Sequence, residues 1–574
     1  MNKIKKQLSL DLSSVVGFSV EENNFSAPPN SEAGDLALPC FDFAKSQKKN
    51  PVELAKEIKE KLNDTLDYLE KVETQGPYLN FTFKTDYLFN EVLGAKNKKG
   101  IRISVPIRNP LYKPLKIMIE YSQPNTHKEF HVGHLRNACL GASLVNVNRY
   151  LGHKVISANY LGDTGVHVAK TLWNFQKFHK DDQLPENKGQ FLGKIYSEAV
   201  NKLDDNKEFQ TEVSELQKKL EEGDKELTKL WKETKQWSLD SFDQIYKLLG
   251  IEFDQWFWES EEEEAGRKMI DKILKKGTIK EIKESQGAII ADLTAYDLDV
   301  LVLVKSDGNM LYGTKDLPLG KKKFDKFKID KSVYIIDNRQ SLYVKQIFKL
   351  LDLLGYDKKD KYHVAYDFVT LPEGAMASRT GNVVTFEDFY NEVLELSKTE
   401  TALRHTDWTV DKVNETAEHI SLAAIKFWML KYDNNKVIVF DPKKALAFDG
   451  DTGPYILYTI ARINSIFAKS LTRDSAISGD EDFNLLTDQS ERELALQIAK
   501  FEDTITKVAE NYSPITLCTY LIELSHNFNN FYHKCHVLDQ KEDLQKARLA
   551  LLHKTRETLE KGLDLLNIKS VLQM

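Results

Sequence analysis

Cysteine is scarce in this sequence, and the few cysteines stand far apart. Among 574 residues there are only four, at Cys40, Cys139, Cys518 and Cys535, and none forms a CxxC pair. Disulfide-stapled secreted domains and zinc ribbons need closely spaced cysteines, so the sequence excludes both classes. The spacing fits a chain that lives in a reducing, cytoplasmic compartment.

Long apolar runs, repeats and an excess of positive charge are missing as well. No stretch of eighteen uncharged apolar residues occurs, and Asp11 interrupts the apolar part of the N-terminus, so we expect neither a membrane partner nor a secretory signal. The 80 basic and 87 acidic residues give a net charge of −7. A uniformly basic coat is therefore excluded and we expect no DNA partner, although local basic faces remain open.

What the chain does have is length and a globular composition. Hydrophobic residues make up 41% of it, and 574 residues imply roughly three to four domains. The first ~90 residues have the size of a separate module. Within it we predict a helix over Pro51–Val72, a strand over Tyr78–Phe83 and a linker at Gly94–Gly100.

Beyond the linker the pattern changes to alternating strands and helices. A strand at Lys116–Tyr121, a helix at Leu135–Leu151 and a strand at Lys154–Tyr160 form a βαβ unit. Such a unit predicts a parallel sheet with a ligand site at the loop after the first strand. The fold class is therefore α/β, with a Rossmann-like parallel sheet.

The rest of the chain divides into an insertion, a returning sheet and a helical end. Residues 172–285 are charged and read as a mostly helical insertion. The sheet pattern returns with a hairpin at Val300–Thr314 that turns at Asp307-Gly308, and with strands at Val333–Ile336 and His363–Val369. After Asp411 helical periods dominate, which predicts an all-α bundle.

The loop after the first strand carries the clearest chemical motif, His131-Val-Gly-His134. A strand leads into a helix N-terminus here, so free N–H groups and the helix dipole favour an anion. The imidazoles of His131 and His134 can donate to phosphate oxygens, and Gly133 leaves room for a flat base. The alternatives are a plain pair of histidines at a helix start, or a metal pair, which the spacing disfavours because metal-binding helices use i, i+4.

The surrounding sequence resembles class I arginyl-tRNA synthetases. The resemblance rests on IEYSQPNTHKEFHVGHLRNACLGASL with GHKVISANYLGDTG, and on five further segments in the family's order: LYGTKDLP, DNRQSLYVKQIF, MASRTGN, FDGDTGPYILYTIARI and RLALLHKTRETLEKGLDLLNI. It implies a small α+β N-terminal module over 1–95, a catalytic domain over 96–410 with the insertion at about 172–285, and a helical anticodon-binding domain over 411–574.

The resemblance also implies an activity. Members of the family attach L-arginine to tRNA(Arg) through an arginyl-adenylate made with ATP, and Mg²⁺ is expected to travel with the ATP. His131 and His134 are the HIGH-like signature. The loop 375–382 stands where most class I enzymes have Lys-Met-Ser-Lys-Ser, but both lysines are absent. Arg379 is its remaining cation, with Met376 and Ser378 as ATP contacts, and Lys128 is the lysine thought to compensate.

By the same resemblance, five residues bind the amino acid. Carboxylates that grip a guanidinium in a bidentate way suit arginine, because a lysine would leave part of the fork unpaired. One departure is Gln123, where the family more often has a small residue. The implied arginine-binding residues are Glu120, Asn125, Tyr312, Asp316 and Gln340.

Three parts of the chain are candidates for holding tRNA. Tyr455 and Tyr458 could stack on anticodon bases or could simply belong to a helix core. The seven lysines of Lys315–Lys331 could face RNA, although a charge run is usually a solvated face. The family would place the N-terminal module at the outer corner of the tRNA.

Three other readings compete. A small-molecule nucleotidyltransferase would not need the outer modules. Another class I synthetase, for cysteine or glutamine, is the second reading, and a cysteine enzyme would need zinc-ligating cysteines. A non-catalytic tRNA-binding paralogue is supported only by the missing loop lysines. We also expect arginine activation to need bound tRNA, because the loop 375–382 alone is a weak clamp for phosphate.

Overall fold

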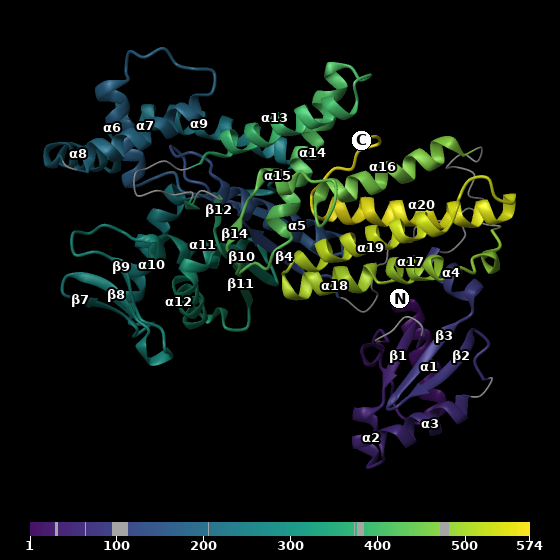
Figure 1. The fold of residues 1–574 in the computed structure, drawn as a ribbon. Coiled ribbons are helices and arrows are strands. Elements are labelled where there is room, and N and C mark those ends of the chain that lie inside the picture. Colours follow the sequence, from purple (N-terminus) through teal and green to yellow (C-terminus); the bar gives the residue numbers. More distant parts are fainter. Residues whose placement is uncertain are drawn as a thin grey trace.

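An antiparallel sheet wrapped by helices forms the N-terminal module of this computed structural model, which describes residues 1–28, 33–62, 65–93, 113–204, 206–371, 374–375, 384–470 and 481–574 (Figure 1). The strands follow the order β1-β3-β2. Their bounds are β1 Leu36–Pro39, β2 Leu69–Gln75 and β3 Tyr78–Phe83, and the helices are α1 Asn2–Val16, α2 Phe41–Gln47, α3 Pro51–Leu62 and α4 Thr85–Leu93.

The predicted strand at Tyr78–Phe83 is confirmed, but the predicted helix over Pro51–Val72 is wrong in its second half. The helix ends at Leu62, and Val72 lies in β2, where it pairs with Phe81 of β3. Pairing with a buried neighbouring strand outweighs the helical spacing of single apolar residues. The predicted linker at Gly94–Gly100 lies outside the described residues.

The middle part of the chain is built on a five-stranded, all-parallel sheet. Its order is β11-β10-β4-β5-β6. The switch point lies between the neighbours β4 and β10, because the chain continues from β4 to β5 and β6 on one side and from β10 to β11 on the other. Ligands bind at the carboxyl ends of strands at such a point. The bounds are β4 Lys116–Glu120, β5 Lys154–Leu161, β6 Gln255–Trp258, β10 Lys331–Asp337 and β11 Asp360–Tyr366.

Helix α5, Val132–Tyr150, is the crossover between β4 and β5 and confirms the predicted βαβ unit. It is buried along most of its length, because it packs on the sheet and also contacts the helical C-terminal region. Gly141 allows the close approach, since a Cβ there would stand 2.0 Å from the ring of Tyr121.

The insertion departs from the sequence prediction because it contains a strand of the main sheet. Strand β6 pairs in parallel with β5 and ends the excursion, which was predicted as mostly helical up to residue 285. Four residues with two tryptophans are too short for a periodic pattern to be seen. The helices of this part are α6 Val166–Phe178, α7 Lys188–Leu203, α8 Lys207–Glu221, α9 Lys225–Leu249 and α10 Glu259–Lys276.

The predicted hairpin over Val300–Thr314 is also corrected. The turn at Asp307-Gly308 is present, but only a single bridge between Val304 and Met310 follows it, and α11 begins at Tyr312. The partner of β9 is instead the preceding strand β8. These elements are β7 Ile282–Ser285, β8 Ala288–Asp292, β9 Val300–Val304, α11 Tyr312–Phe327 and α12 Ser341–Leu351.

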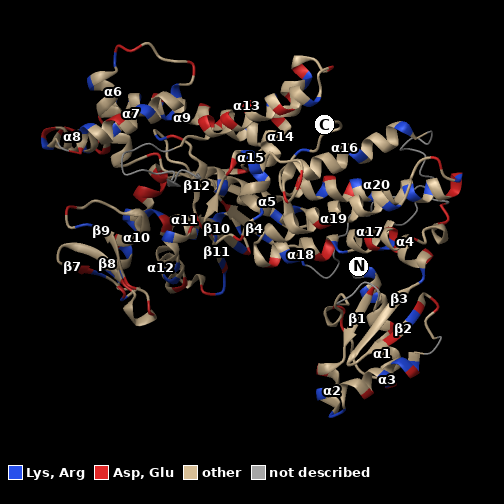
Figure 2. Ribbon diagram, viewed as in Figure 1, with Lys and Arg blue, Asp and Glu red and all other residues tan. Residues whose placement is uncertain are grey.

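The C-terminal part is a helical bundle, as predicted, joined to the sheet by the short strands β12 Val369–Leu371, β13 Gly374–Ala375 and β14 Ile438–Val439. Acidic and basic residues are both scattered along its helices (Figure 2). Among the described residues no helix is long and apolar enough to span a membrane. The helices are α13 Phe386–Arg404, α14 Val410–Leu430, α15 Pro442–Ala445, α16 Gly453–Lys469, α17 Gln489–Ala499, α18 Phe501–Asn511, α19 Ile515–Lys534 and α20 Glu542–Leu565.

The N-terminal module is docked on this bundle (Figure 1). Arg492 of α17 forms a bidentate ion pair with the buried carboxylate of Asp35 and donates to the carbonyl of Phe83 at 2.7 Å. The rings of Phe89 and Phe483 stack 5.9 Å apart beside it. A charge-assisted pair with two parallel hydrogen bonds fixes orientation as well as contact.

Candidate active site

The two signature histidines cap the helix that they begin. His131 is the N-cap of α5, and its Nδ1 accepts from the backbone N–H groups of Gly133 at 3.1 Å and His134 at 3.4 Å. In return the His131 N–H donates to Nδ1 of His134 at 3.3 Å. The first-turn N–H groups of Gly133 and His134 are thus occupied by an imidazole, which corrects the expectation that they point freely at a ligand.

This capping arrangement fixes the proton on each imidazole. Because Nδ1 accepts in both rings, the neutral form carries its proton on Nε2, where it can donate. Burial lowers the pKa of His131 to about 4, helped by Lys128 and Arg339, and burial also takes the pKa of His134 well below its usual value. The two rings stack 3.7 Å apart. At neutral pH the pair is therefore uncharged, with two N–H donors.

Gly133 serves the cap itself. A Cβ at this position would stand 2.9 Å from Cε1 of His131, so any side chain would push the capping ring away. The ring of His131 therefore occupies the space beside Gly133 that was expected to receive a flat base.

A cavity of about 750 Å³ opens at the carboxyl ends of β4 and β10. It brings together residues that are far apart in the sequence and that were predicted separately. Those lining it are Glu120, Asn125, His131, Gly133, His134, Tyr312, Asp316 and Gln340. Of the remaining predictions, Met376, Ser378 and Arg379 lie outside the described residues.

Lys128 is the predicted catalytic residue that does not line this cavity. Its ammonium group lies over the ring of Tyr196, 5.0 Å from the centroid. Burial is the main reason that its pKa is lowered, and the neighbouring charge of Lys170 adds to the effect. Lys128 nevertheless acts on the site through its charge, since it helps to lower the pKa values of His131 and His134.

The acids of the cavity differ in how their charge is balanced. Glu120 pairs with the fully buried Lys323, whose Nζ lies 2.7 Å from Oε2. Asp337 pairs with Arg339 at 2.7 Å. Among the described residues, Asp316 is the lining carboxylate with no lysine or arginine in ion-pair contact. The cavity therefore offers one uncompensated negative charge.

Asp316 is held in place by the phenol of Tyr343. The Tyr343 hydroxyl donates a short hydrogen bond to its Oδ2. Burial raises the pKa of Asp316 to about 6, and the nearby charge of Glu120 adds to this. Burying a carboxylate is unfavourable unless a cation joins it, so this position favours a cationic ligand.

Lys315, Lys323 and Glu259 form ion pairs at the site but were not predicted from the sequence. Lys323 and Lys315 belong to the lysine run Lys315–Lys331, for which RNA contact was considered. Both are buried: Lys315 lies 3.4 Å from Glu259 and 3.5 Å from Glu263, and Lys323 holds Glu120. The sequence held one clue: Asp316 and Lys323 are seven residues apart, which places them on the same face of a helix, and an acid and a lysine on one face can both point inward.

Glu259, the first residue of α10, lines the cavity as well. Burial raises its pKa to about 7, and only Lys315 opposes this among its main influences. Gln123, the residue that departs from the family pattern, donates to Oε1 of Glu120 at 3.1 Å. Its substitution therefore affects a carboxylate of the cavity.

The signature loop is fastened to the insertion by a buried histidine that the sequence did not single out. The ring of His127 bonds to the hydroxyls of Thr126 at 2.9 Å and Thr234 at 2.8 Å, and the backbone N–H of His127 donates to the hydroxyl of Ser238. Burial lowers the pKa of His127 to about 3. Helix α9 thus holds the loop that precedes the signature.

The two tyrosines predicted to bind tRNA lie in different surroundings. Tyr455 is buried, its hydroxyl shares a hydrogen bond with His526 and accepts from Asn529 at 2.6 Å, which fits the helix-core alternative. Tyr458 lines a groove of about 990 Å³ on the bundle, and its hydroxyl accepts from Arg462 at 2.9 Å.

Matches to known families agree with this geometry. Residues 108–441 match the catalytic domain of class I (R) tRNA synthetases, residues 456–574 the DALR anticodon binding domain, and residues 2–83 the arginyl tRNA synthetase N-terminal domain. The parallel sheet with its capped His-Val-Gly-His helix is thus that of a class I aminoacyl-tRNA synthetase.

The relatives narrow the class. The chain is 37% identical to the arginine–tRNA ligase of Bdellovibrio bacteriovorus over 94% of this chain and 92% of that one, and 33% identical to that of Clostridium perfringens over 100% and 98%. The arginyl-tRNA synthetase structure of Thermus thermophilus superposes with a TM-score of 0.83 at 25% identity, covering 99% of this chain and 100% of the other. The chain belongs to the arginyl-tRNA synthetase family, the arginine–tRNA ligases.

Proposed function

We propose that this cavity joins L-arginine to ATP and that the chain then transfers the arginyl group from the adenylate to a hydroxyl at the 3′ end of tRNA(Arg), with AMP as the leaving group. An arginine carboxylate oxygen forms a bond to the α-phosphorus, the bond from that phosphorus to the bridging oxygen breaks, and pyrophosphate leaves. The observation that carries the choice of amino acid is the uncompensated, buried carboxylate of Asp316. A guanidinium supplies the missing cation and two parallel donors.

Arginine is proposed to occupy the half of the cavity where β4 ends and α11 begins. Glu120 and Asp316 flank its side chain, with Tyr312 at the mouth, where its side chain is 61% exposed. Asn125 and Gln340 line the same cavity and are assigned to the amino acid as well. Glu120 already has Lys323 as its ion-pair partner, so that only Asp316 needs the incoming cation.

ATP is proposed to lie against the start of α5. His131 and His134 have Nε2–H donors free of their capping bonds, which suits charge that grows on the α-phosphate oxygens. Gly133 keeps the capping ring in place, and Lys128 contributes positive potential from behind. Met376, Ser378 and Arg379 are assigned to the phosphate loop on the family pattern alone. Mg²⁺ is proposed to arrive on the ATP phosphates, which it binds together with water.

The tRNA is proposed to bind along the bundle groove that contains Tyr458. Tyr532 and Arg462 share this groove, with the guanidinium 5.0 Å from the Tyr458 ring and 4.9 Å from the Tyr532 ring. Trp408 and His405 stack 3.8 Å apart on its rim. Aromatic faces and a cation are the groups that bind splayed bases. Tyr455 is proposed to support this wall from the core.

The division into residues 1–95, 96–410 and 411–574 is part of the same proposal, with the first and last units gripping tRNA and the middle one performing the chemistry. A cytoplasmic location is proposed as well, since all four cysteines are buried free thiols.

The test is charging of total tRNA with arginine, lysine or citrulline, the neutral analogue of arginine. We expect arginine alone to be transferred. Citrulline leaves Asp316 without a cation, and a site built for such contacts rejects the analogue by roughly 10⁴-fold. Citrulline or lysine transferred at the rate of arginine would contradict the proposal, and so would charging of any other amino acid in a survey of all twenty.

A further inference from the structure

Arg136 follows the signature histidines on α5, and its side chain is fully buried. Its guanidinium binds five main-chain carbonyls in two segments that are far apart in the sequence. Nη1 donates to the carbonyls of Asp367 and Phe368, and at 2.9 Å to that of Lys436, while Nη2 donates to Asp433 at 3.1 Å and Asn434 at 3.0 Å.

This is an unusual way to hold a buried charge. Its hydrogen-bond acceptors among the described residues are carbonyl dipoles and not carboxylates. Burial lowers the pKa of Arg136 to about 10, so the group is still charged at neutral pH. A planar fork with five N–H donors can serve two segments at once, whereas an ammonium has three donors around a single atom.

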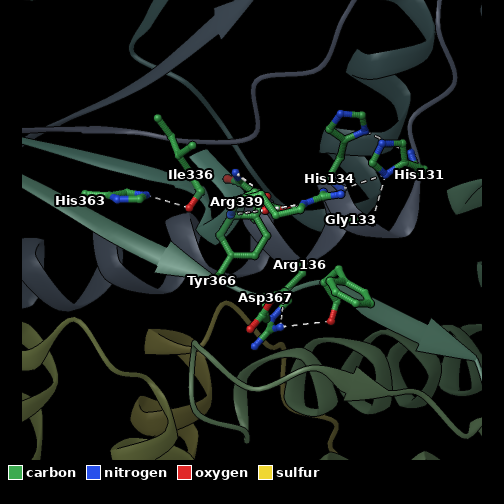
Figure 3. A network of polar contacts seen from close by, with 12 residues as sticks. His131, Gly133, His134, Arg136, Ile336, Arg339, His363, Tyr366 and Asp367 are labelled. Carbon is green, nitrogen blue, oxygen red and sulfur yellow. Dashed lines mark hydrogen bonds and ion pairs between the residues drawn. The ribbon is translucent and has the colours of Figure 1, made fainter. Parts of the chain in front are cut away.

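The first of the two segments is a wall of the cavity. Tyr366, Phe368 and Val369 all line it, on the same cavity as His131 and His134. In the view of Figure 3, the two histidines lie above the Tyr366 ring, and Arg136 lies below it with Asp367. Strand β12 starts at Val369 and pairs with β13 at Gly374–Ala375, directly before the phosphate loop.

The second segment is the turn between α14 and β14. Its Asn434 accepts from the N–H of Asp367 at 2.8 Å, and its side-chain amide donates to the carbonyl of Tyr512 in the bundle at 2.9 Å. The turn then leads into β14, which runs parallel to β12. The two segments would thus stay together without Arg136. What the guanidinium adds is a connection of both segments to α5, where among the described residues Asn137 alone makes a single further hydrogen bond to them, to the Tyr366 hydroxyl at 3.2 Å.

We propose that Arg136 is a positioning residue that sets the ATP-side wall, residues 366–369, at a fixed place relative to the histidines of α5. The same group ties the turn 433–436, and through Asn434 the bundle, to that helix. The inference rests on the proposed ATP half of the cavity. It predicts a selective defect, because among the described residues the hydrogen bonds of Arg136 go to residues 367–368 and 433–436, and not to β4, α11 or α12, which build the arginine half.

The test is Arg136→Lys, assayed for aminoacylation with saturating tRNA. Misplacing a reacting group by about 1 Å costs on the order of 10²-fold, so we expect kcat/KM for ATP to fall by that order while the Kd for arginine, measured by calorimetry, stays as in the wild type. The matched control is Arg149→Lys on the same helix, whose half-exposed side chain pairs with Asp254. It should leave both constants unchanged.

Two results would overturn the proposal: an unchanged kcat/KM for ATP in Arg136→Lys, or equal losses for ATP and arginine, which would indicate general damage. If Arg136→Lys does not fold, Asn434→Ala decides, because it loosens the same turn without removing the buried cation. We then expect a rise in KM for ATP and an unchanged Kd for arginine, and an unchanged KM refutes the inference. Wild-type enzyme that fails to charge arginine would instead contradict the proposed function.

Discussion

Replacing Asp316 by asparagine should move the affinity for arginine and the stability of the free enzyme in opposite directions. The carboxylate is buried, bonded to the Tyr343 hydroxyl and free of any ion pair among the described residues. Asparagine keeps the shape and an acceptor oxygen for Tyr343, but it removes the charge. Bound arginine then loses its counter-ion, while the empty site loses a buried charge.

The pKa of Asp316 sets the size of the stability effect. It lies near 6 in the folded chain, against 3.8 ordinarily, so the folded state holds the proton more tightly. The penalty on folding is absent below pH 3.8, grows as the pH rises to 6 and is complete above it. Two pKa units correspond to about 3 kcal/mol. The weaker bond from Tyr343 to a neutral acceptor offsets about 1 kcal/mol of this.

For arginine binding the sign is reversed. Losing the charged partner of a buried guanidinium costs about 2–5 kcal/mol, which is roughly a 30-fold to several-thousand-fold rise in Kd. In the wild type, arginine binding should also weaken about tenfold per pH unit below pH 6, because the carboxyl group must first lose its proton.

The assay pairs calorimetry of arginine binding with thermal unfolding at pH 8 in the absence of ligand. Asp325→Asn is the matched control, since it lies on the same helix α11 but outside the cavity, where it binds Lys321 and Tyr356. An unchanged Kd for arginine in Asp316→Asn would place the guanidinium site elsewhere. A melting temperature that falls in parallel with affinity would refute the argument about the buried charge.

Three further outcomes follow from the same contacts. His131→Ala and His134→Ala should reduce the adenylation rate by roughly 10²–10³-fold and leave the Kd for arginine near its normal value. Steady-state exchange of pyrophosphate measures the rate and calorimetry measures the Kd. Wild-type turnover in either variant would show that the histidine does not stabilise the phosphate. Acid should unfold the insertion early, because burial holds the pKa of His127 and of His167 at about 3. The stability that depends on the neutral rings is complete above pH 6.5 and is lost as the pH falls towards 3. Tryptophan fluorescence should therefore report unfolding between pH 6.5 and 3, and His127→Gln should flatten this pH dependence. Exchange of pyrophosphate with ATP and arginine should appear only when tRNA is present and should fall in Lys128→Ala at saturating tRNA; fast exchange without tRNA would contradict this.

The sheet and the bundle were predictable because their patterns are local and long. The βαβ unit around α5 follows from two short apolar runs with a helix between them, and the helices from α16 onward follow from their period. The failures lie where pairing between distant segments decides. Val72 joins a strand because of Phe81, and β6 joins the main sheet across the whole insertion. The missing second arm of the hairpin reflects the competing start of α11 at Tyr312.

In the candidate site, too, some features were predictable from the sequence and others were not. The family motif identified the residues that line the cavity, since strand ends and helix starts converge there. It could not show how their charges are balanced. Lys323 and Lys315 look like members of a solvated lysine run, and only the folded helix α11 turns them inward to Glu120 and Glu259. The buried tie of Arg136 to carbonyls was equally hidden, because main-chain acceptors leave no trace in a sequence.

Strand β6 has a consequence for how much the insertion can change in length. Between the end of β5 at Leu161 and the start of β6 at Gln255 the chain makes a long excursion, yet closing such a loop costs only about 2 kcal/mol more than closing a minimal crossover of a dozen residues. The residue just before β6 is fixed to β5 by its own contacts, since Asp254 accepts from the N–H and hydroxyl of Ser157. A shortened excursion would therefore still complete the sheet. A deletion that removes α9 would, however, release His127 from Thr234 and leave the signature loop without its anchor, whereas a deletion confined to α7 and α8 would keep that anchor.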